Sequence, residues 1–272
     1  MTIIEKAANI AIKTRGLCKE FAGLVAVDCI DLEVKRGEVF AFLGPNGAGK
    51  STTIRMLTTL LKPTRGEIRV NGFNPLTEEA AVRQSFGIVF QDPSLDEDLT
   101  AYENMEFHGA LYEVPNQLRE KRIEELLRLV ELWQRKDSFV RDFSGGMKRR
   151  LEIARGLLHH PKILFLDEPT IGLDPQTRNQ IWKYIQSLNE KEKITVFFTT
   201  HYIEEAEKVS QRIAIIDNGK IVAAGTSQEL MAKTDTLSLE AAFLLITGHS
   251  LREESANSKI ERLRQGKKLN QK

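Results

Sequence analysis

Residues 44–51 carry a glycine-rich sequence, GPNGAGKS, with the composition and spacing of a phosphate-binding loop. Its glycines let the backbone turn tightly enough to aim several N–H groups at one anion, and the positive end of a following helix adds to the attraction. In this pattern Lys50 brings a mobile charge to the β and γ phosphates, and the hydroxyl of Ser51 binds Mg²⁺. The residues expected around the phosphates are Gly44, Pro45, Asn46, Gly47, Ala48, Gly49, Lys50, Ser51 and Thr52.

A second chemical element is a pair of carboxylates at the end of an apolar segment, Ile163 to Leu166 followed by Asp167 and Glu168. A buried parallel strand has this composition, and ligands of open α/β sheets gather at the carboxyl ends of such strands. Asp167 is then placed to hold Mg²⁺ directly or through water. Glu168 points elsewhere and can act as general base on an attacking water.

The elements that must position these groups follow from apolar stretches bounded by turns. They predict strands at residues 12–15, 30–34, 39–43, 67–70, 88–90, 163–166, 195–199, 212–216 and 220–223. A helix over residues 52–61 follows the phosphate loop, and further helices separate several of the strands. This alternation favours an α/β fold with a parallel sheet and crossover connections.

The segment from about residue 92 to residue 142 has a different pattern. It contains no convincing strand, and its apolar residues recur at helical spacing. We predict a helical subdomain inserted into the α/β core, with a packing stripe made of Ile123, Leu126, Leu127, Val130 and Trp133.

Composition excludes several classes of protein. The 272 residues are 41% hydrophobic, so the chain should fold, and the net charge of +1 provides no broad field to hold nucleic acid. Cys18 and Cys29 are the only cysteines. With no CxxC motif, they predict neither a zinc site nor a disulfide framework. This favours a reduced, cytosolic compartment. No segment has the 18 or so apolar residues of a membrane helix, and the N-terminus does not resemble a signal peptide.

The organisation we expect is one domain over residues 1–250 and a basic tail over residues 251–272. The tail holds seven basic and three acidic residues. A solvated tail is the simplest interpretation, although such a charge would add weak attraction to an anionic membrane.

Five motifs in order identify a family. With the phosphate loop come Gln91 after a strand, Phe143-Ser144-Gly145-Gly146-Met147 at the start of a helix, Gly172-Leu173-Asp174 after the Asp167-Glu168 pair, and Thr200-His201 after the next strand. Over about residues 10–225 this series closely resembles the ATP-binding cassette (ABC) ATPases. The segments 149–156, 199–207 and 239–248 are similar to exporter ATPases of the daunorubicin-resistance type (ABC-2). The resemblance implies a P-loop NTPase core of the ABC ATPase type with an antiparallel β subdomain and an inserted helical subdomain.

The resemblance also implies roles and partners. Two copies form a head-to-tail homodimer, in which each ATP lies between the phosphate loop of one subunit and Ser144, Gly145 and Gly146 of the other. His201 contacts the γ phosphate and orients Glu168 and the water, and Gln91 reaches Mg²⁺ and the water. The remaining implied contacts are Asp174, which crosses the dimer interface, and Phe21, which stacks on adenine unless it belongs to the core.

Because no membrane span is predicted, we expect transport to require a separate permease. The chain would then be an exporter ATPase, cytoplasmic and peripheral on the inner face of the membrane, with the cargo path in the permease. The docking face we expect follows Gln91 and includes Asp92, Asp96, Glu97 and Asp98. An importer ATPase and a non-transport ABC protein acting on nucleic acid or the ribosome are the alternatives. A metabolic P-loop kinase would have no use for residues 143–147.

Overall fold

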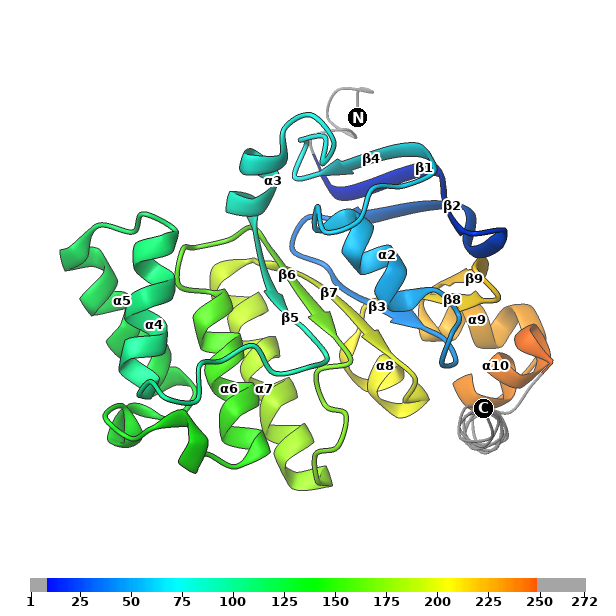
Figure 1. The fold of residues 1–272 in the computed structure, drawn as a ribbon. Helices are drawn as coiled ribbons and strands as arrows, with labels where there is room; N and C mark the ends of the chain where they lie inside the picture. Colours follow the sequence, from blue (N-terminus) through cyan, green and yellow to red (C-terminus); the bar gives the residue numbers. More distant parts are fainter. Residues whose placement is uncertain (1–8, 249–272) are drawn as a thin grey trace, which may run out of the picture.

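The computed structural model describes residues 9–248 and arranges them as two β-sheets with surrounding helices (Figure 1). The strands are β1 (Ile10–Phe21), β2 (Leu24–Lys35), β3 (Val39–Leu43), β4 (Arg65–Val70), β5 (Phe86–Val89), β6 (Ile163–Asp167), β7 (Thr195–Thr200), β8 (Arg212–Asp217) and β9 (Lys220–Gly225). The α-helices are α2 (Lys50–Leu57), α3 (Glu79–Ser85), α4 (Ala101–Leu111), α5 (Asn116–Leu129), α6 (Gly145–Gly156), α7 (Pro175–Glu192), α8 (Ile203–Val209), α9 (Ser227–Thr234) and α10 (Leu239–Thr247). Two short 3₁₀ helices are η1 (Trp133–Arg135) and η2 (Val140–Asp142).

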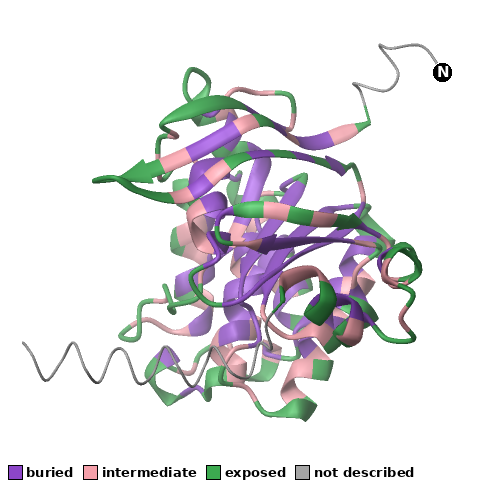
Figure 2. Ribbon diagram, turned by 90° about the vertical axis from the view of Figure 1, so that its right-hand side faces the viewer, coloured by how far each residue is buried: buried purple, intermediate pink, exposed green. Residues whose placement is uncertain are grey.

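The larger sheet has six strands in the order β5-β6-β7-β3-β8-β9. Every neighbouring pair is parallel except β8 and β9, which are antiparallel. All residues of β3, β6 and β7 are buried, and Figure 2 shows these central strands as the most buried part of the fold. A strand covered on both faces needs apolar side chains on both, which explains the unbroken apolar segments in the sequence.

The smaller sheet is antiparallel, in the order β2-β1-β4, as the family resemblance implies. One hydrophobic core includes Leu17 of this sheet, Phe40 and Phe165 of the large sheet, and Ile54 and Leu57 of α2. Helix α2, which follows β3 after the loop of residues 44–49, is therefore held by the core that joins the two sheets.

The two cysteines form a disulfide between β1 and β2, and the prediction of unpaired thiols is wrong. The cause is the register of the hairpin. Leu17 pairs with Ile30 and Lys19 with Val27, so Cys18 comes to lie beside Cys29, with their Cα atoms 4.4 Å apart. An eleven-residue spacing across a hairpin gives no CxxC pattern, yet it places two side chains side by side.

The predicted helical insert is confirmed. Residues 92–142 contain α4, α5, η1 and η2 and no strand. The side chains of Ile123, Leu126, Leu127 and Val130 are buried in a second core that also includes Leu151 of α6 and residues of β6, β7 and α7, while Trp133 packs against that core half-buried.

All nine predicted strands are present, although helix α2 differs from its prediction. It begins at Lys50 and stops at Leu57, four residues before the expected end. Thr58 caps it, Thr59 has a left-handed φ of 66°, and Pro63 follows soon after, so the helix cannot continue.

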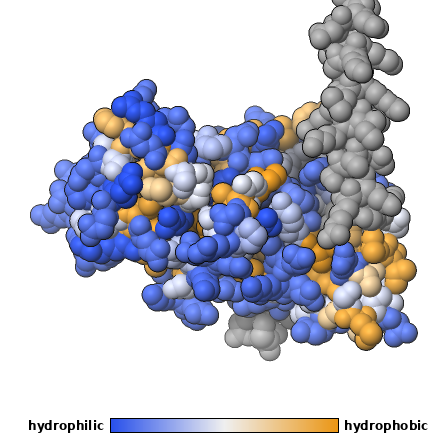
Figure 3. Space-filling model, turned by 90° about the horizontal axis from the view of Figure 1, so that it is seen from below, coloured by the Kyte–Doolittle hydropathy of each residue, from blue (hydrophilic) through white to orange (hydrophobic). Residues whose placement is uncertain are grey.

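The described chain ends in α9 and α10, beyond β9. Leu237, Leu244 and Leu245 are exposed there, on the side that carries the apolar area at the right of Figure 3. Within residues 9–248 no helix combines the length and apolarity needed to span a bilayer. The predicted basic tail over residues 251–272 lies outside the described residues.

Candidate active site

The phosphate loop connects β3 to α2, as its sequence predicts. A Cβ at Gly44 would overlap the carbonyl oxygen of Ile216, so only glycine fits against β8. Gly47 and Gly49 have left-handed φ angles of 84° and 102°, which favour glycine. Gly49 is also the N-cap of α2 and makes no side-chain cap, so the backbone N–H groups of the first turn face the loop. Together these features are those expected of an anion-binding turn.

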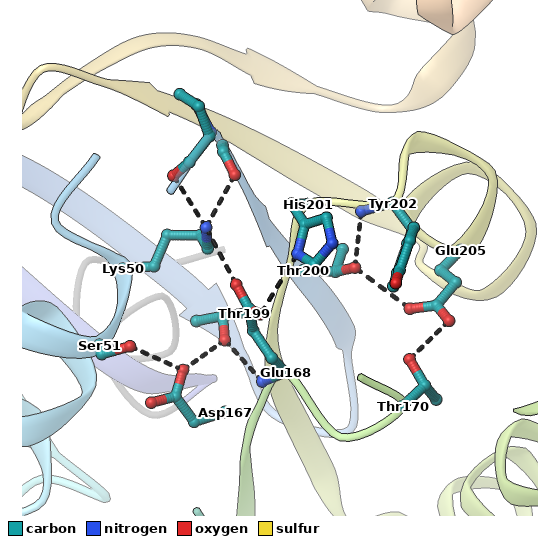
Figure 4. A network of polar contacts seen from close by, with 12 residues as sticks. Lys50, Ser51, Asp167, Glu168, Thr170, Thr199, Thr200, His201, Tyr202 and Glu205 are labelled. Carbon is teal, nitrogen blue, oxygen red and sulfur yellow. Dashed lines mark hydrogen bonds and ion pairs between the residues drawn. The ribbon is translucent and has the colours of Figure 1, made fainter. Parts of the chain in front are cut away.

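Lys50 is buried at the start of α2. Its Nζ donates hydrogen bonds to the carbonyl oxygens of Gly44 (2.8 Å) and Pro45 (2.9 Å), and it lies 3.2 Å from Oε1 of Glu168. Figure 4 shows the ammonium group between the loop and the carboxylate. The charge that should meet the phosphates is therefore anchored inside the loop.

Ser51 and Asp167 lie together, one from α2 and one from the end of β6. The Ser51 hydroxyl donates to Oδ1 of Asp167 at 3.2 Å. Thr199 of β7, which is fully buried, donates to the same oxygen at 2.6 Å and accepts a 2.9 Å hydrogen bond from the backbone N–H of Glu168. A hydroxyl and a carboxylate are oxygen ligands of the kind Mg²⁺ prefers. The described residues contain no cluster of three His, Cys, Asp or Glu that could hold a metal ion.

Glu168 is held in a strained position. Its φ of 47° is left-handed, and its side chain is only 7% exposed. Nδ1 of His201 lies 3.2 Å from Oε2, and Lys50 lies beside Oε1. Burial acts to raise the pKa of Glu168, but the hydrogen bond to His201 and the charge of Lys50 outweigh it and leave the pKa below its ordinary value. The group is therefore ionised, and because an ionised carboxylate can only accept hydrogen bonds, Nδ1 of His201 is the donor.

Five predicted site residues thus meet in one cluster: Lys50, Ser51, Asp167, Glu168 and His201. Sequence analysis missed three threonines and a glutamate that hold this cluster. Thr199 is one, and the others are Thr170, Thr200 and Glu205 (Figure 4). The threonines had a signal in the sequence, as polar residues at the end of an apolar strand and in the turn after Glu168, whereas Glu205 lies in the first turn of α8.

Gln91 lies just beyond the end of β5. Arg149 of α6 donates to the carbonyl oxygens of Phe90 (2.5 Å) and Gln91 (2.9 Å), so the backbone of this segment is held by the helix that starts with the Ser144 motif. Burial lowers the pKa of Arg149, and Glu152, 3.0 Å away, opposes that effect. The segment carrying Gln91 is consequently tied to α6.

Ser144, Gly145, Gly146 and Asp174 are placed at helix starts rather than in the Lys50 cluster. Ser144 caps α6 by accepting from the N–H of Met147 at 3.3 Å. Asp174 caps α7. It accepts a 2.6 Å hydrogen bond from the Thr177 hydroxyl and further bonds from the backbone N–H groups of residues 176 and 177, which keep its pKa below the ordinary range. A Cβ at Gly146 would lie 2.6 Å from the Thr177 side chain, so the two helix starts are close neighbours.

Phe21 stands at the end of β1, and its side chain is 44% exposed with Nζ of Lys19 4.8 Å from the ring centre. This position rules out the alternative that Phe21 belongs to the core. An accessible ring can stack on a flat ligand.

Comparison with known proteins supports this picture. The family model described as ABC transporter matches residues 27–171, slightly more than half of the chain. The daunorubicin/doxorubicin resistance ATP-binding protein DrrA of Streptomyces peucetius is 46% identical over 220 residues, 81% of this chain and 66% of that protein. The linearmycin resistance ATP-binding protein LnrL of Bacillus subtilis is 42% identical over 222 residues, 82% of this chain and 71% of that protein.

Solved structures agree. One described as the ATP binding subunit of an ABC transporter has a TM-score of 0.79 and 29% identity and covers 87% of this chain and 99% of its own. An ATP-binding cassette described as a dimer in a post-hydrolysis state bound to ADP and Pi has a TM-score of 0.71 and 30% identity, over 79% of this chain and 98% of its own. The chain therefore belongs to the ABC transporter family, as an ATP-binding, ATP-hydrolysing subunit of the daunorubicin-resistance exporter type.

Proposed function

We propose that the Lys50, Glu168 and His201 cluster is where ATP is hydrolysed, with Glu168 as the general base. The observation that carries this is a buried, ionised carboxylate held between a lysine and a histidine at the mouth of an anion-binding loop. Glu168 would take a proton from a water aimed at the γ phosphate. Lys50 and the loop N–H groups would stabilise the charge on the phosphates as the β–γ bond breaks to give ADP and phosphate.

Two further groups would complete the nucleotide site. Ser51 and Asp167 would hold Mg²⁺, with Gln91 as a third contact, and the ion would supply charge neutralisation at the β and γ oxygens. The half-exposed ring of Phe21 would stack on adenine, which is worth roughly 0.5–1.5 kcal/mol beyond the area it buries.

The placement of two helix starts supports a dimer. Ser144 leads into Gly145 and Gly146 on α6, and Asp174 begins α7 next to them. Both starts belong to the same face of one chain, and neither side chain makes its hydrogen bonds to the chain's own Lys50 cluster. In a head-to-tail homodimer this face would lie against the partner's phosphate loop, and the α6 N-terminus would meet the γ phosphate. ATP would then join the two copies, and its hydrolysis would release them.

Substitution Glu168→Gln tests this assignment because it keeps the shape and removes the base. The variant should bind ATP, lose turnover by at least about a hundredfold, and elute as a dimer only when ATP is present. Glu204→Gln changes an exposed carboxylate on α8, three residues after His201. It is the matched control and should behave as wild type. Normal ATP hydrolysis by the Glu168 variant would show that the base has been misassigned.

A separate membrane permease would dock beside Gln91. A cavity of about 420 Å³ lies there, between α4 and α6, and its rim carries Phe107 and Leu111, each 67% exposed. Glu97 is paired with Lys148 and Asp98 with Arg141. Much of the acidic charge expected to mark this face is therefore already neutralised, and the apolar rim is the better contact for a permease helix.

The test is a double substitution, Phe107→Ser and Leu111→Ser, in cells that export through the permease. Purified protein should keep its basal ATPase rate, since neither residue touches the Lys50 cluster, while export and co-purification with the permease should fall. Unchanged export would remove this face as the docking site. The names of the relatives describe resistance and export ATP-binding proteins, which supports export over import, and a subunit acting through a permease would work at the cytoplasmic face of the membrane.

A further inference from the structure

Glu205 is a buried carboxylate that the hydrolytic scheme above does not use. It lies in the first turn of α8 and is 8% exposed. Its Oε1 accepts a 2.6 Å hydrogen bond from the hydroxyl of Thr170, and its Oε2 accepts a 3.1 Å hydrogen bond from the hydroxyl of Thr200. Both threonines are 1% exposed. Within residues 9–248 no lysine, arginine or histidine pairs with Glu205, so its charge is satisfied by these two hydroxyls alone.

One of these hydroxyls controls the segment around His201. Besides donating to Glu205, the Thr200 hydroxyl accepts a 2.9 Å hydrogen bond from the backbone N–H of Tyr202. This bond joins the residue before His201 to the residue after it. The Thr200 carbonyl accepts from the N–H of Gly44 at 3.2 Å, which adds a tie to the phosphate loop. The backbone that carries the imidazole is thus fixed at the residues before and after it.

The other hydroxyl controls the turn that follows the general base. The carbonyl of Glu168 accepts from the N–H of Ile171, and the carbonyl of Thr170 accepts from the N–H of Leu173, both at 3.2 Å. Thr170 therefore sits inside a hydrogen-bonded turn that begins at Glu168 and leads to Asp174. Figure 4 shows Glu205 between this turn and the His201 segment.

We propose that Glu205 is a positioning residue that holds the His201 segment on the turn running from Glu168 to Asp174. It never touches nucleotide. Its two oxygens fix the spacing of the two segments, and so keep Nδ1 of His201 at 3.2 Å from Glu168. In the proposed dimer Asp174 faces the second nucleotide. Glu205 would therefore link His201 of one nucleotide site to the segment that approaches the other nucleotide site. This proposal rests on the roles proposed above for His201 and Glu168.

Two substitutions break the link from opposite ends. In Glu205→Gln the amide nitrogen donates instead of accepting, so one threonine loses its acceptor. Thr170→Val removes only the hydroxyl on the turn and leaves the carboxylate and Thr200 in place. We expect each to lower kcat about tenfold, the effect of losing one hydrogen bond to a charged group, with the KM for ATP changed less than about twofold. Because each variant breaks the same link between the two segments, the double variant should be no slower than the slower single variant.

A second measurement is independent of turnover. The ring ¹⁵N resonances of His201 report its tautomer and its hydrogen bond to Glu168. They should shift in both variants, although neither residue touches His201. Glu204→Gln is the matched control, an exposed carboxylate one position away on α8, and should change neither kcat nor these resonances. Thr170→Val keeps the test valid if Glu205→Gln does not fold.

His201→Ala is measured in parallel. If it abolishes turnover while Glu205→Gln and Thr170→Val retain wild-type kcat and unshifted resonances, Glu205 is structural only and the proposal is wrong, while the site stands. If His201→Ala itself hydrolyses ATP normally, the proposed role of His201 fails, and the role of Glu205 fails with it.

Discussion

Thr199→Val removes one hydroxyl and two hydrogen bonds at the centre of the site. The hydroxyl of Thr199 donates to the carboxylate of Asp167 and accepts from the N–H of Glu168, and the side chain is fully buried. Losing a hydrogen bond to a charged group costs about 1.5–3 kcal/mol, and leaving a buried N–H without a partner costs about 1–3 kcal/mol. We therefore expect the free energy of unfolding to fall by about 3 kcal/mol or more, a large share of a total of about 5–15 kcal/mol.

The assay is thermal unfolding followed by circular dichroism. For a chain of this size, about 3 kcal/mol lowers the melting temperature by roughly 6–12 °C. Turnover should fall more than about tenfold as well, because the left-handed backbone of Glu168 loses its anchor. Thr58→Val is the matched control. It is an equally buried threonine whose hydroxyl donates only to a helix carbonyl, and it should cost about 1 kcal/mol. If the melting temperatures of the two variants lie within 2 °C of each other, their free energies of unfolding differ by no more than roughly 1 kcal/mol. That result would refute the predicted cost of losing the Thr199 hydroxyl.

Two further predictions use the same melting assay. Gly44→Ala should lower the melting temperature far more than Gly47→Ala, because a Cβ at Gly44 meets the carbonyl of Ile216. A Cβ at Gly47 meets open space, so this substitution should cost only the roughly 1 kcal/mol of a left-handed φ. Equal losses of stability in the two variants would contradict the close approach at Gly44. Burial holds the pKa of His108 at about 3 and that of His159 at about 4. The unfolded chain therefore binds protons that the folded chain does not, and stability should fall on going from pH 7 to pH 5, by at most about 2 kcal/mol for each histidine. Replacing both with Gln should flatten this dependence, and an unchanged pH profile would show that other groups cause it.

The strands, the helical insert and the Lys50 cluster were predictable because their signals are local. A parallel strand buried on both faces must be apolar throughout, so β3, β6 and β7 stand out as continuous segments. The chemical groups follow directly at the carboxyl ends of these strands, where parallel topology brings them to one edge. Lys50, Asp167 and His201 could therefore be placed together before any distance was known.

The contacts that the sequence did not predict depend on register between distant segments. The disulfide follows from the pairing of Leu17 with Ile30, which bulges in the hairpin make hard to count from sequence. Thr199 reaches Asp167 only because β7 lies beside β6 in the sheet, with these two residues paired. Glu205 likewise joins Thr170 and Thr200, which are 30 residues apart, and polar residues that support a site have no spacing rule of their own.

The ion pair between Lys50 and Glu168 gives the site an order of events. In the described structure the positive charge of Lys50 helps to keep the pKa of Glu168 low, so the carboxylate is a weak base while that pair holds. Phosphate oxygens at the loop would compete for the same ammonium group, since they also attract its charge. As Lys50 turns to the phosphates, its hold on the carboxylate weakens, and the pKa of Glu168 should rise. The base would therefore become stronger only when nucleotide is bound, and the hydrogen bond from His201 would then be the main contact that keeps Glu168 aimed at the water.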